Sequence, residues 1–287
     1  MRRTTWSRLD NNFYGARPSG SISHDPELVS SKLLPPLQRE SHLSAGHPLD
    51  LMVRSLCLRV PLSTASREAV LALPHTIRSL DPSAYLVREG EVPSQCGVLV
   101  SGFAYRQKTT GTGSRQIIAL HMPGDAVDFQ HLFLNIADHS VQMLTAGKVA
   151  FVPRSALQSL ARSNAEVAEA IFTKILVESS IFREWVLNVG RRKARERIAH
   201  ILCELGARLE ALGLAGEYGY ELPMTQEQLG DAVGLTPVHV NRTLKALVGE
   251  GLIDRCNRSI RFPNWQNIRD LAGFNERYLH NVSQSPS

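Results

Sequence analysis

The pattern of apolar and polar positions divides the chain into an irregular start, a middle of short apolar runs and a helical second half. Residues 1 to about 50 lack sustained periodicity and are rich in Ser, Pro, Gly, His and Asn. This composition buries too little apolar surface to order a backbone, so it predicts a disordered tail, which we place at residues 1–55. More regular sequence begins near Met52, and a short helix is expected at residues 63–73.

Short apolar runs alternate with turns in the middle of the chain. Gly, Pro or Ser-Gly sequences separate them at intervals of roughly 8–12 residues, a spacing typical of a small sandwich or roll. The runs lie at residues 84–91, 96–102, 103–110, 115–125, 140–147 and 148–157. Together with the helical second half, they predict an α+β fold in which residues 56–160 form a β-roll.

A long helix is predicted after the β-rich region. Its apolar residues recur at steps of three and four, as Ile171, Ile175, Phe182, Trp185 and Val189. A seam of this kind suits a partner helix, so we assign residues 161–190 to a dimerisation helix and hinge. The alternative is a helix that packs only on the β-roll of its own chain.

Two short helices with well-marked ends follow. Thr225 is a candidate N-cap, and Gln228 three residues later completes a capping box. Gly234 stands where a left-handed C-cap would end the first helix. Thr236 can cap the second helix, with Pro237 at its first position, where a missing N–H costs nothing. Two such helices joined by a tight turn predict a helix-turn-helix, with a plain helical hairpin as the alternative.

The second helix has two different faces. At about 100° per residue, one face is apolar and consists of Val240, Leu244, Leu247 and Val248. The opposite face carries no acidic residue over three turns and contains Val238, Arg242 and Lys245, flanked by His239, with Asn241 at its edge. A surface helix usually mixes charges of both signs, so this face suits a polyanion.

A hairpin rich in arginine follows the two helices. Residues 252–255 and 259–262 read as short strands around a turn, which is the wing of a winged helix-turn-helix. With the wing, we assign residues 191–275 to DNA binding and residues 276–287 to a C-terminal tail. The expected DNA contacts are Thr225, Gln226, Thr236, Val238, His239, Asn241, Arg242, Lys245, Arg258 and Arg261.

Composition is compatible with this assignment. The 287 residues are 43% hydrophobic and 21% charged, with a net charge of +5 that suits a polyanion partner. The densest basic run, residues 191–197, is either a solvated helix start or a phosphate contact. No apolar run is long enough to span a membrane, and the N-terminus lacks the apolar region of a secretory signal. The four cysteines lie far apart without a C-x-x-C pair, so we expect a reduced, cytoplasmic protein.

A β-roll, a long helix, a hinge and a winged helix-turn-helix, in that order, resemble the Crp/Fnr family of bacterial transcription regulators over about residues 60–270. The resemblance is strongest in "MTQEQLGDAVGLTPVHVNRTLKALVGEGLI" and in "MPGDAVDF" followed by "DHSVQMLTAGKVAFVPRSAL". It implies a cyclic-nucleotide-binding-like roll and a homodimer that reads two-fold symmetric double-stranded DNA. In many members a small effector binds in the roll, and an activator of this kind would contact RNA polymerase.

The resemblance also suggests how DNA is read. Arg242 matches the family's arginine in the middle of the recognition helix, and such a residue can bond bidentately to guanine. The alternative is that Arg242 pairs with a backbone phosphate or with an acid of its own domain. Val238 stands where many members have a glutamate that accepts from cytosine, so only apolar contact is expected there.

The residues by which the family binds cyclic AMP are not present. Where the binding members have Gly-Glu, this chain has Asp128 and Phe129, and where they have Arg-Ser it has His139 and Ser140. Phe129 cannot accept ribose hydrogen bonds, and Asp128 would repel a phosphate. An iron–sulfur centre needs about four thiolates, but before residue 63 there is only Cys57. Neither cyclic AMP nor such a cluster is therefore expected.

Histidines in the roll leave one alternative from another class, a cupin-like β-barrel enzyme or ligand-binding protein with an appended helical domain. His121, His131 and His139 are potential metal ligands. A β-barrel enzyme of the cupin kind would need a His-x-His followed by a Glu on adjacent strands, and no such spacing occurs. We expect no metal site and no catalytic residues, and the effector is not identified by the sequence.

Overall fold

Two helices precede the β-roll. The structure, a computed structural model, describes residues 46–215 and 219–281; most of the expected N-terminal tail lies outside these residues. Within the tail we had expected, α1 (Asp50–Cys57) is a helix with Leu49 and Met52 in the core. The boundary at residue 55 was wrong, because the apolar residues of α1 pack into the core of the β-roll. The short helix predicted near 63–73 is α2 (Thr64–Leu71).

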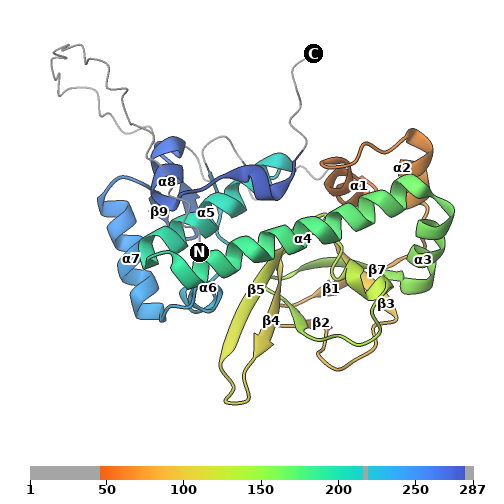
Figure 1. Ribbon diagram of the computed structural model, residues 1–287, viewed down its shortest axis with the longest axis horizontal. Helices are drawn as coiled ribbons and strands as arrows, with labels where there is room; N and C mark the ends of the chain where they lie inside the picture. Colours follow the sequence, from red (N-terminus) through yellow and green to blue (C-terminus); the bar gives the residue numbers. More distant parts are fainter. Residues whose placement is uncertain (1–45, 216–218, 282–287) are drawn as a thin grey trace, which may run out of the picture. The chain divides into compact units, whose positions relative to one another are not determined.

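Two antiparallel sheets form the roll (Figure 1). One has the order β1 (Thr76–Leu80), β7 (Gly147–Pro153), β3 (Gln95–Leu99). The other has the order β2 (Tyr85–Val87), β6 (Ser140–Met143), β4 (Ala104–Thr109), β5 (Arg115–His121). The α+β fold with a β-roll is thereby confirmed. Strand β1 was not predicted, because its residues are mostly exposed and lack an apolar alternation.

The turn after β5 brings α1 against the roll. Gly124 has a φ of +90°, and a Cβ there would lie 2.6 Å from the carbonyl oxygen of Leu51 in α1. Only glycine combines this backbone conformation with so close an approach. The next residue, Asp125, is buried and forms an ion pair of 2.7 Å with Lys174 of the long helix α4 (Ala165–Arg191). The "PGD" turn therefore joins α1, the roll and the long helix.

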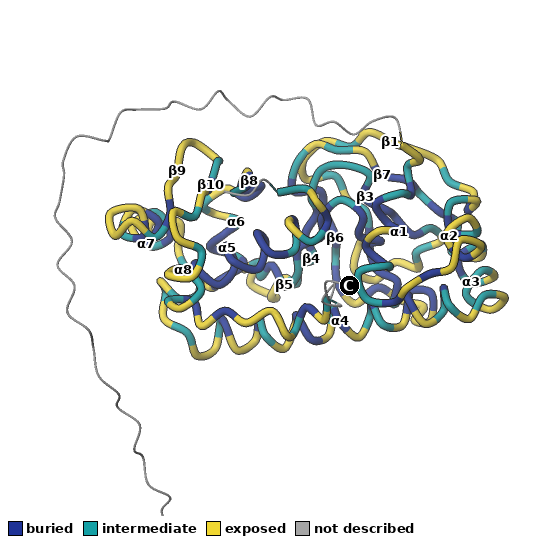
Figure 2. The backbone as a smooth tube through the Cα atoms, turned by 90° about the horizontal axis from the view of Figure 1, so that it is seen from above, coloured by how far each residue is buried: buried dark blue, intermediate teal, exposed yellow. Residues whose placement is uncertain are grey.

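Helices dominate the rest of the described chain. After the 3-10 turn η1 (Phe129–Leu132) and β7 come α3 (Arg154–Ser163), α4 (Ala165–Arg191) and α5 (Ala194–Ala211). Asn164 caps α4 by accepting from the backbone N–H of Val167. Buried and exposed positions alternate along α4 (Figure 2). None of the described helices is long and apolar enough to cross a membrane.

A small winged domain completes the fold. Helices α6 (Gln226–Val233) and α7 (Pro237–Gly249) are followed by β9 (Asp254–Cys256), β10 (Ser259–Arg261), α8 (Trp265–Ala272) and the 3-10 turn η2 (Glu276–Leu279). Strand β8 (Gly219–Glu221) pairs with β10 and makes the wing a three-stranded sheet. The sequence analysis did not predict β8.

Candidate functional site: the helix-turn-helix, the α4 face and the β-roll

The ends of α6 and α7 are fixed by the residues that the sequence singled out. Thr225 Oγ1 accepts from the N–H of Gln228 at 3.2 Å, and Gln228 Oε1 accepts from the N–H of Thr225 at 2.9 Å. Gly234 has a φ of 67° and ends α6. Thr236 Oγ1 accepts from the N–H of His239 at the start of α7. The tight turn of a helix-turn-helix is therefore confirmed in its local geometry.

One face of α7 packs on the domain core. Val240, Leu244 and Leu247 are buried as predicted, together with Thr243. Val248, which we had placed on this face, is 41% exposed. At about 100° per residue, Thr243 and Val248 lie at opposite edges of the stripe formed by Val240, Leu244 and Leu247, and it is the Thr243 edge that faces the core.

The opposite face of α7 is open and basic. Val238 is 80% exposed, and Arg242 and Lys245 are exposed on the same side. Neither Arg242 nor Lys245 forms an ion pair within residues 46–215 and 219–281, so the structure does not favour the alternative in which Arg242 pairs with an acid of its own domain. Of the neighbouring candidates, Thr225 and Thr236 are exposed, whereas Gln226, His239 and Asn241 are half-buried.

The wing presents further exposed cations. Arg258, in the turn between β9 and β10, and Arg261, the last residue of β10, are both exposed. Arg258 donates to the carbonyl oxygen of Pro223 at 3.4 Å, a contact that holds its side chain near the start of α6. Asn257, in the hairpin turn, has a positive φ of 53°, which Asn tolerates better than most residues. These arginines are available to oxygen ligands outside the chain.

The basic run at residues 191–197 has a structural role that neither of our alternatives included. Arg192 pairs with Glu184 of α4 at 2.5 Å, and Arg195 pairs with Glu250 at the end of α7. Arg197 donates to the carbonyl oxygen of Val233 in α6 at 3.1 Å. The run therefore connects α4 and α5 to the helix-turn-helix through its arginines.

Helix α4 buries one side and exposes another. Ile171 and Trp185, expected on a partner-facing seam, are buried in their own chain, with Trp185 bonded to Glu204 of α5. For these two the prediction was wrong. Helix α4 has one apolar stripe that packs on its own chain and another that is exposed, and the hydrophobic pattern of the sequence does not distinguish the two. Ile175 and Val189 are half-buried. The exposed apolar residues of α4 are Phe172, Leu176, Phe182, Val186 and Leu187.

The positions that hold cyclic AMP in the family are filled from within the chain. Asp128 is buried, and its carboxylate lies 2.5 Å from Arg106 of β4 and 2.9 Å from His139 Nε2. Burial alone would raise the pKa of Asp128, but Arg106 and His139 hold it below its usual range. Phe129 is buried in η1. An ion network within the protein thus occupies these positions.

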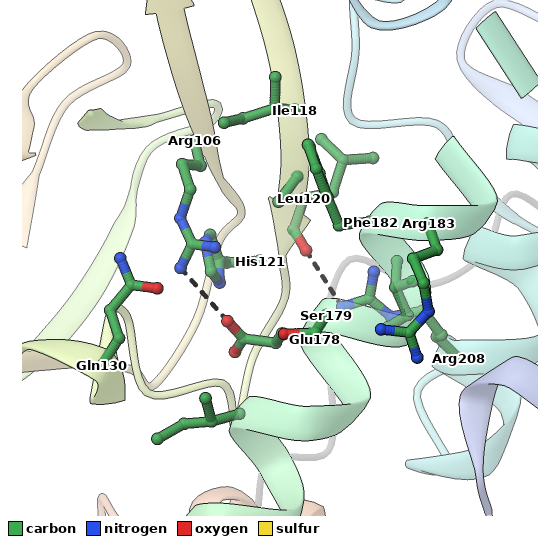
Figure 3. A pocket seen from close by; sticks show the side chains of 13 residues that line it. Arg106, Ile118, Leu120, His121, Gln130, Glu178, Ser179, Phe182, Arg183 and Arg208 are labelled. Carbon is green, nitrogen blue, oxygen red and sulfur yellow. Dashed lines mark hydrogen bonds and ion pairs between the residues drawn. The ribbon is translucent and has the colours of Figure 1, made fainter. Parts of the chain in front are cut away.

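Arg106 also faces a cavity on its other side. Its guanidinium lies 3.3 Å from Glu178 of α4, a residue that lines this cavity together with His121 (Figure 3). Burial, and secondarily Arg106, lowers the pKa of His121 to about 4, so the imidazole is neutral at pH 7. His131 stacks on His139 with ring centroids 5.7 Å apart. Among the described residues, no three His, Cys, Asp or Glu side chains are grouped to hold a metal ion.

The cysteines lie in different environments. Cys96 and Cys203 are buried, Cys57 is half-buried and Cys256 is exposed in the wing. Burial raises the pKa of the thiols of Cys96 and Cys203, so both stay protonated. All four are free.

Comparison with known proteins agrees with this architecture. The model of the cyclic nucleotide-binding domain matches residues 77–164, and that of the Crp-like helix-turn-helix domain matches residues 196–271. The transcriptional activator protein FnrA of Stutzerimonas stutzeri is 24% identical over 82% of this chain and 94% of its own length. The nitrogen fixation regulation protein FixK of Azorhizobium caulinodans is 27% identical over 76% of this chain and 86% of its own.

A solved structure extends the comparison to three dimensions. FixK2 from Bradyrhizobium japonicum superposes with a TM-score of 0.64 at 28% identity, over 69% of this chain and 98% of that protein. The matching region includes a β-roll followed by a helix-turn-helix, in the order found here. The chain belongs to the Crp/Fnr family of bacterial transcription regulators.

Proposed function

We propose that this chain is a homodimeric regulator that binds two-fold symmetric double-stranded DNA by placing α7 in the major groove. The open basic face of α7 carries the proposal, because Arg242 and Lys245 are exposed and have no ion-pair partner among the described residues. Unpaired cations on an outward helix face suit the phosphates and base edges of DNA. This role places the protein in the cytoplasm.

Individual residues would have different tasks. Arg242 would bond to a guanine, and Val238 would contact an apolar group such as a thymine methyl. Lys245, Arg258 and Arg261 would contact phosphates, which set affinity and its dependence on salt. Thr225, Gln226, Thr236, His239 and Asn241 would contribute polar contacts at the edges of the interface.

The second subunit would pack on the exposed face of α4. Phe172, Leu176 and Val186 recur at the spacing of a coiled-coil seam, and Phe182 lies beside them. Five large apolar side chains exposed on one helix are unfavourable in water unless another protein surface buries them. Half-sites one helical turn apart, about 10–10.5 base pairs, would then meet the two copies of α7.

The roll would not bind cyclic AMP, because Arg106 and His139 are already bonded to the buried carboxylate of Asp128 there. No iron–sulfur cluster is proposed, and family membership disfavours a cupin-like enzyme. We propose no catalytic activity. As a relative of transcriptional activators, the protein would also contact RNA polymerase.

Footprinting of purified protein on genomic fragments tests this function. We expect protected sites with two-fold symmetric sequences, and binding that weakens steeply with salt. Failure to protect any fragment at about 100 nM protein, above the dissociation constants of roughly 10⁻¹¹ to 10⁻⁸ M that are typical of specific DNA binding, would contradict the proposal. Protected sites without symmetry would contradict its dimeric part.

A further inference from the structure

The junction of α4 and α5 carries two cations that the fold itself does not use. Of the five cations in residues 191–197, Arg192, Arg195 and Arg197 make the contacts described above. Arg191 is the last residue of α4, Lys193 directly precedes α5, and both are exposed. Within residues 46–215 and 219–281, neither of these two side chains forms a hydrogen bond or an ion pair. The junction therefore presents two free positive charges.

The acids in contact with this junction have other partners. Glu184 and Glu250 pair with arginines of the run itself. Glu196 Oε2 accepts from the backbone N–H of Lys193 at 2.9 Å, so this carboxylate satisfies a backbone donor at the start of α5. The charges of Arg191 and Lys193 are thus not neutralised by the described part of the chain. A surface of this kind suits an anionic partner.

Two contacts place the junction beside the turn of the helix-turn-helix (Figure 1). A Cβ on Gly234, in that turn, would lie 3.4 Å from Cγ1 of Val189, near the end of α4. Arg197 Nη1 donates to the carbonyl oxygen of Val233, at the end of α6, at 3.1 Å. The turn leads directly into the N-terminus of α7, the end of a recognition helix that contacts base edges. The two free cations therefore lie close to the place where DNA would meet the protein.

The exposed apolar face of α4 extends to the same junction. Val186 and Leu187, in the last two turns of α4, are exposed. If this face joins the subunits, as proposed above, the ends of both copies of α4 lie near the two-fold axis. That axis passes through the centre of a two-fold symmetric operator. The free cations of both subunits would then face the DNA between the half-sites.

We propose that Arg191 and Lys193 of both subunits bind the backbone phosphates at the centre of the operator, between the half-sites that the two copies of α7 read. The inference rests on the proposed function and deepens it, because it adds a DNA contact at the end of the dimer helix to those of the winged domain. Phosphate contacts carry no sequence information directly. The central contact therefore adds affinity and fixes the position of the dimer axis on the DNA.

The salt dependence of binding gives the first test, with full-length protein and a duplex that carries a symmetric site found by footprinting. Each phosphate contact contributes about 0.9 to the slope of log K against log salt, so losing four contacts per dimer should reduce the slope by about 3.6. We expect this change in Arg191→Gln with Lys193→Gln, with the preferred sequence retained. The control is Lys148→Gln with Arg162→Gln, which removes two exposed cations on β7 and α3 and should leave the slope unchanged.

Neutral linkages in the DNA distinguish direct contact from a structural effect of the substitutions. The same duplex is prepared with uncharged methylphosphonate linkages at its central positions. The wild type should bind this duplex more weakly than the unmodified one, whereas Arg191→Gln with Lys193→Gln should bind the two alike. Equal weakening of both proteins by the neutral linkages, or an unchanged salt slope in the variant, would overturn the inference while the wild type still binds its symmetric site. If the wild type protects no site at all, the proposed function fails and this inference fails with it.

Discussion

The indole of Trp185, near the end of α4, donates a hydrogen bond of 3.0 Å to the carboxylate of Glu204 in α5. Tyr278 of η2 donates to the same carboxylate at 2.9 Å. All three groups are largely buried, and burial raises the pKa of Glu204 even though three side chains donate to it. One buried acceptor thus joins the long helix to the first helix of the DNA-binding domain and to the C-terminal segment.

Trp185→Phe should destabilise the protein without changing its oligomeric state. The substitution keeps most of the apolar ring but leaves a buried carboxylate short of one donor, which costs about 1–3 kcal/mol. Urea unfolding should show a lower free energy of unfolding, and sedimentation should show the same species as the wild type. A folded monomer would instead place Trp185 in the subunit interface.

Charges on the exposed face of α4 should separate the subunits. In Leu176→Asp with Val186→Asp, two unpaired carboxylates would be buried if the proposed seam forms, a cost of several kcal/mol. We expect a monomer by analytical ultracentrifugation at micromolar concentration. The control is Ile77→Asp, at an exposed position of β1, which should remain a dimer. A double mutant that still sediments as a dimer would locate the interface elsewhere.

Stability should fall as the pH drops from 7 to 5, partly through His200. Burial, assisted by Arg192, lowers the pKa of His200 to about 3, whereas an unfolded histidine titrates near 6.5. As the pH falls, the unfolded state therefore takes up a proton before the folded state does. The free energy of unfolding is unaffected by His200 above pH 6.5 and decreases as the pH falls from 6.5 towards 3. The expected loss from this one group by pH 5 is about 2 kcal/mol.

His200→Phe isolates that contribution. The ring lies between Phe274 and Tyr278, so an aromatic replacement preserves much of the packing. The pKa of Glu204 is raised, so its protonation stabilises the folded protein as the pH falls, opposite to the effect of His200. Because Glu204 is present in both proteins, its effect cancels when their pH dependences are compared. Unfolding curves at pH 7 and pH 5 should show a smaller difference for His200→Phe than for the wild type. Equal differences would mean that His200 is protonated in the folded protein.

Cyclic AMP should not bind at micromolar concentration. Arg106 and His139 already saturate the Asp128 carboxylate, and a phosphate placed there would meet a buried negative charge. Isothermal titration calorimetry should therefore show no heat beyond dilution. Saturable heat at micromolar cyclic AMP would mean that another set of residues holds the nucleotide.

How much could be predicted from sequence depended on how local the determining contacts are. The starts of α6 and α7 are set by residues three positions apart, such as Thr225 and Gln228, so the caps could be predicted from the sequence. Which apolar residues of α4 are buried and which are exposed could not be predicted, because Ile171 faces the chain's own core and its neighbour Phe172 faces outward. The Arg106 network also escaped prediction, since its acids are 22 and 72 residues away.

Selection from a random DNA pool, run in parallel on the wild type, Arg242→Ala and Lys245→Ala, tests the central claim most directly. If Arg242 reads a guanine, Arg242→Ala should lose about 1–3 kcal/mol of discrimination at one symmetric pair of positions and keep the rest of the site. Lys245→Ala should weaken binding on all sequences alike and reduce the salt dependence. If Arg242→Ala instead loses affinity equally on every sequence, with no position relaxed, then Arg242 contacts phosphate and the proposed reading of DNA by α7 is wrong.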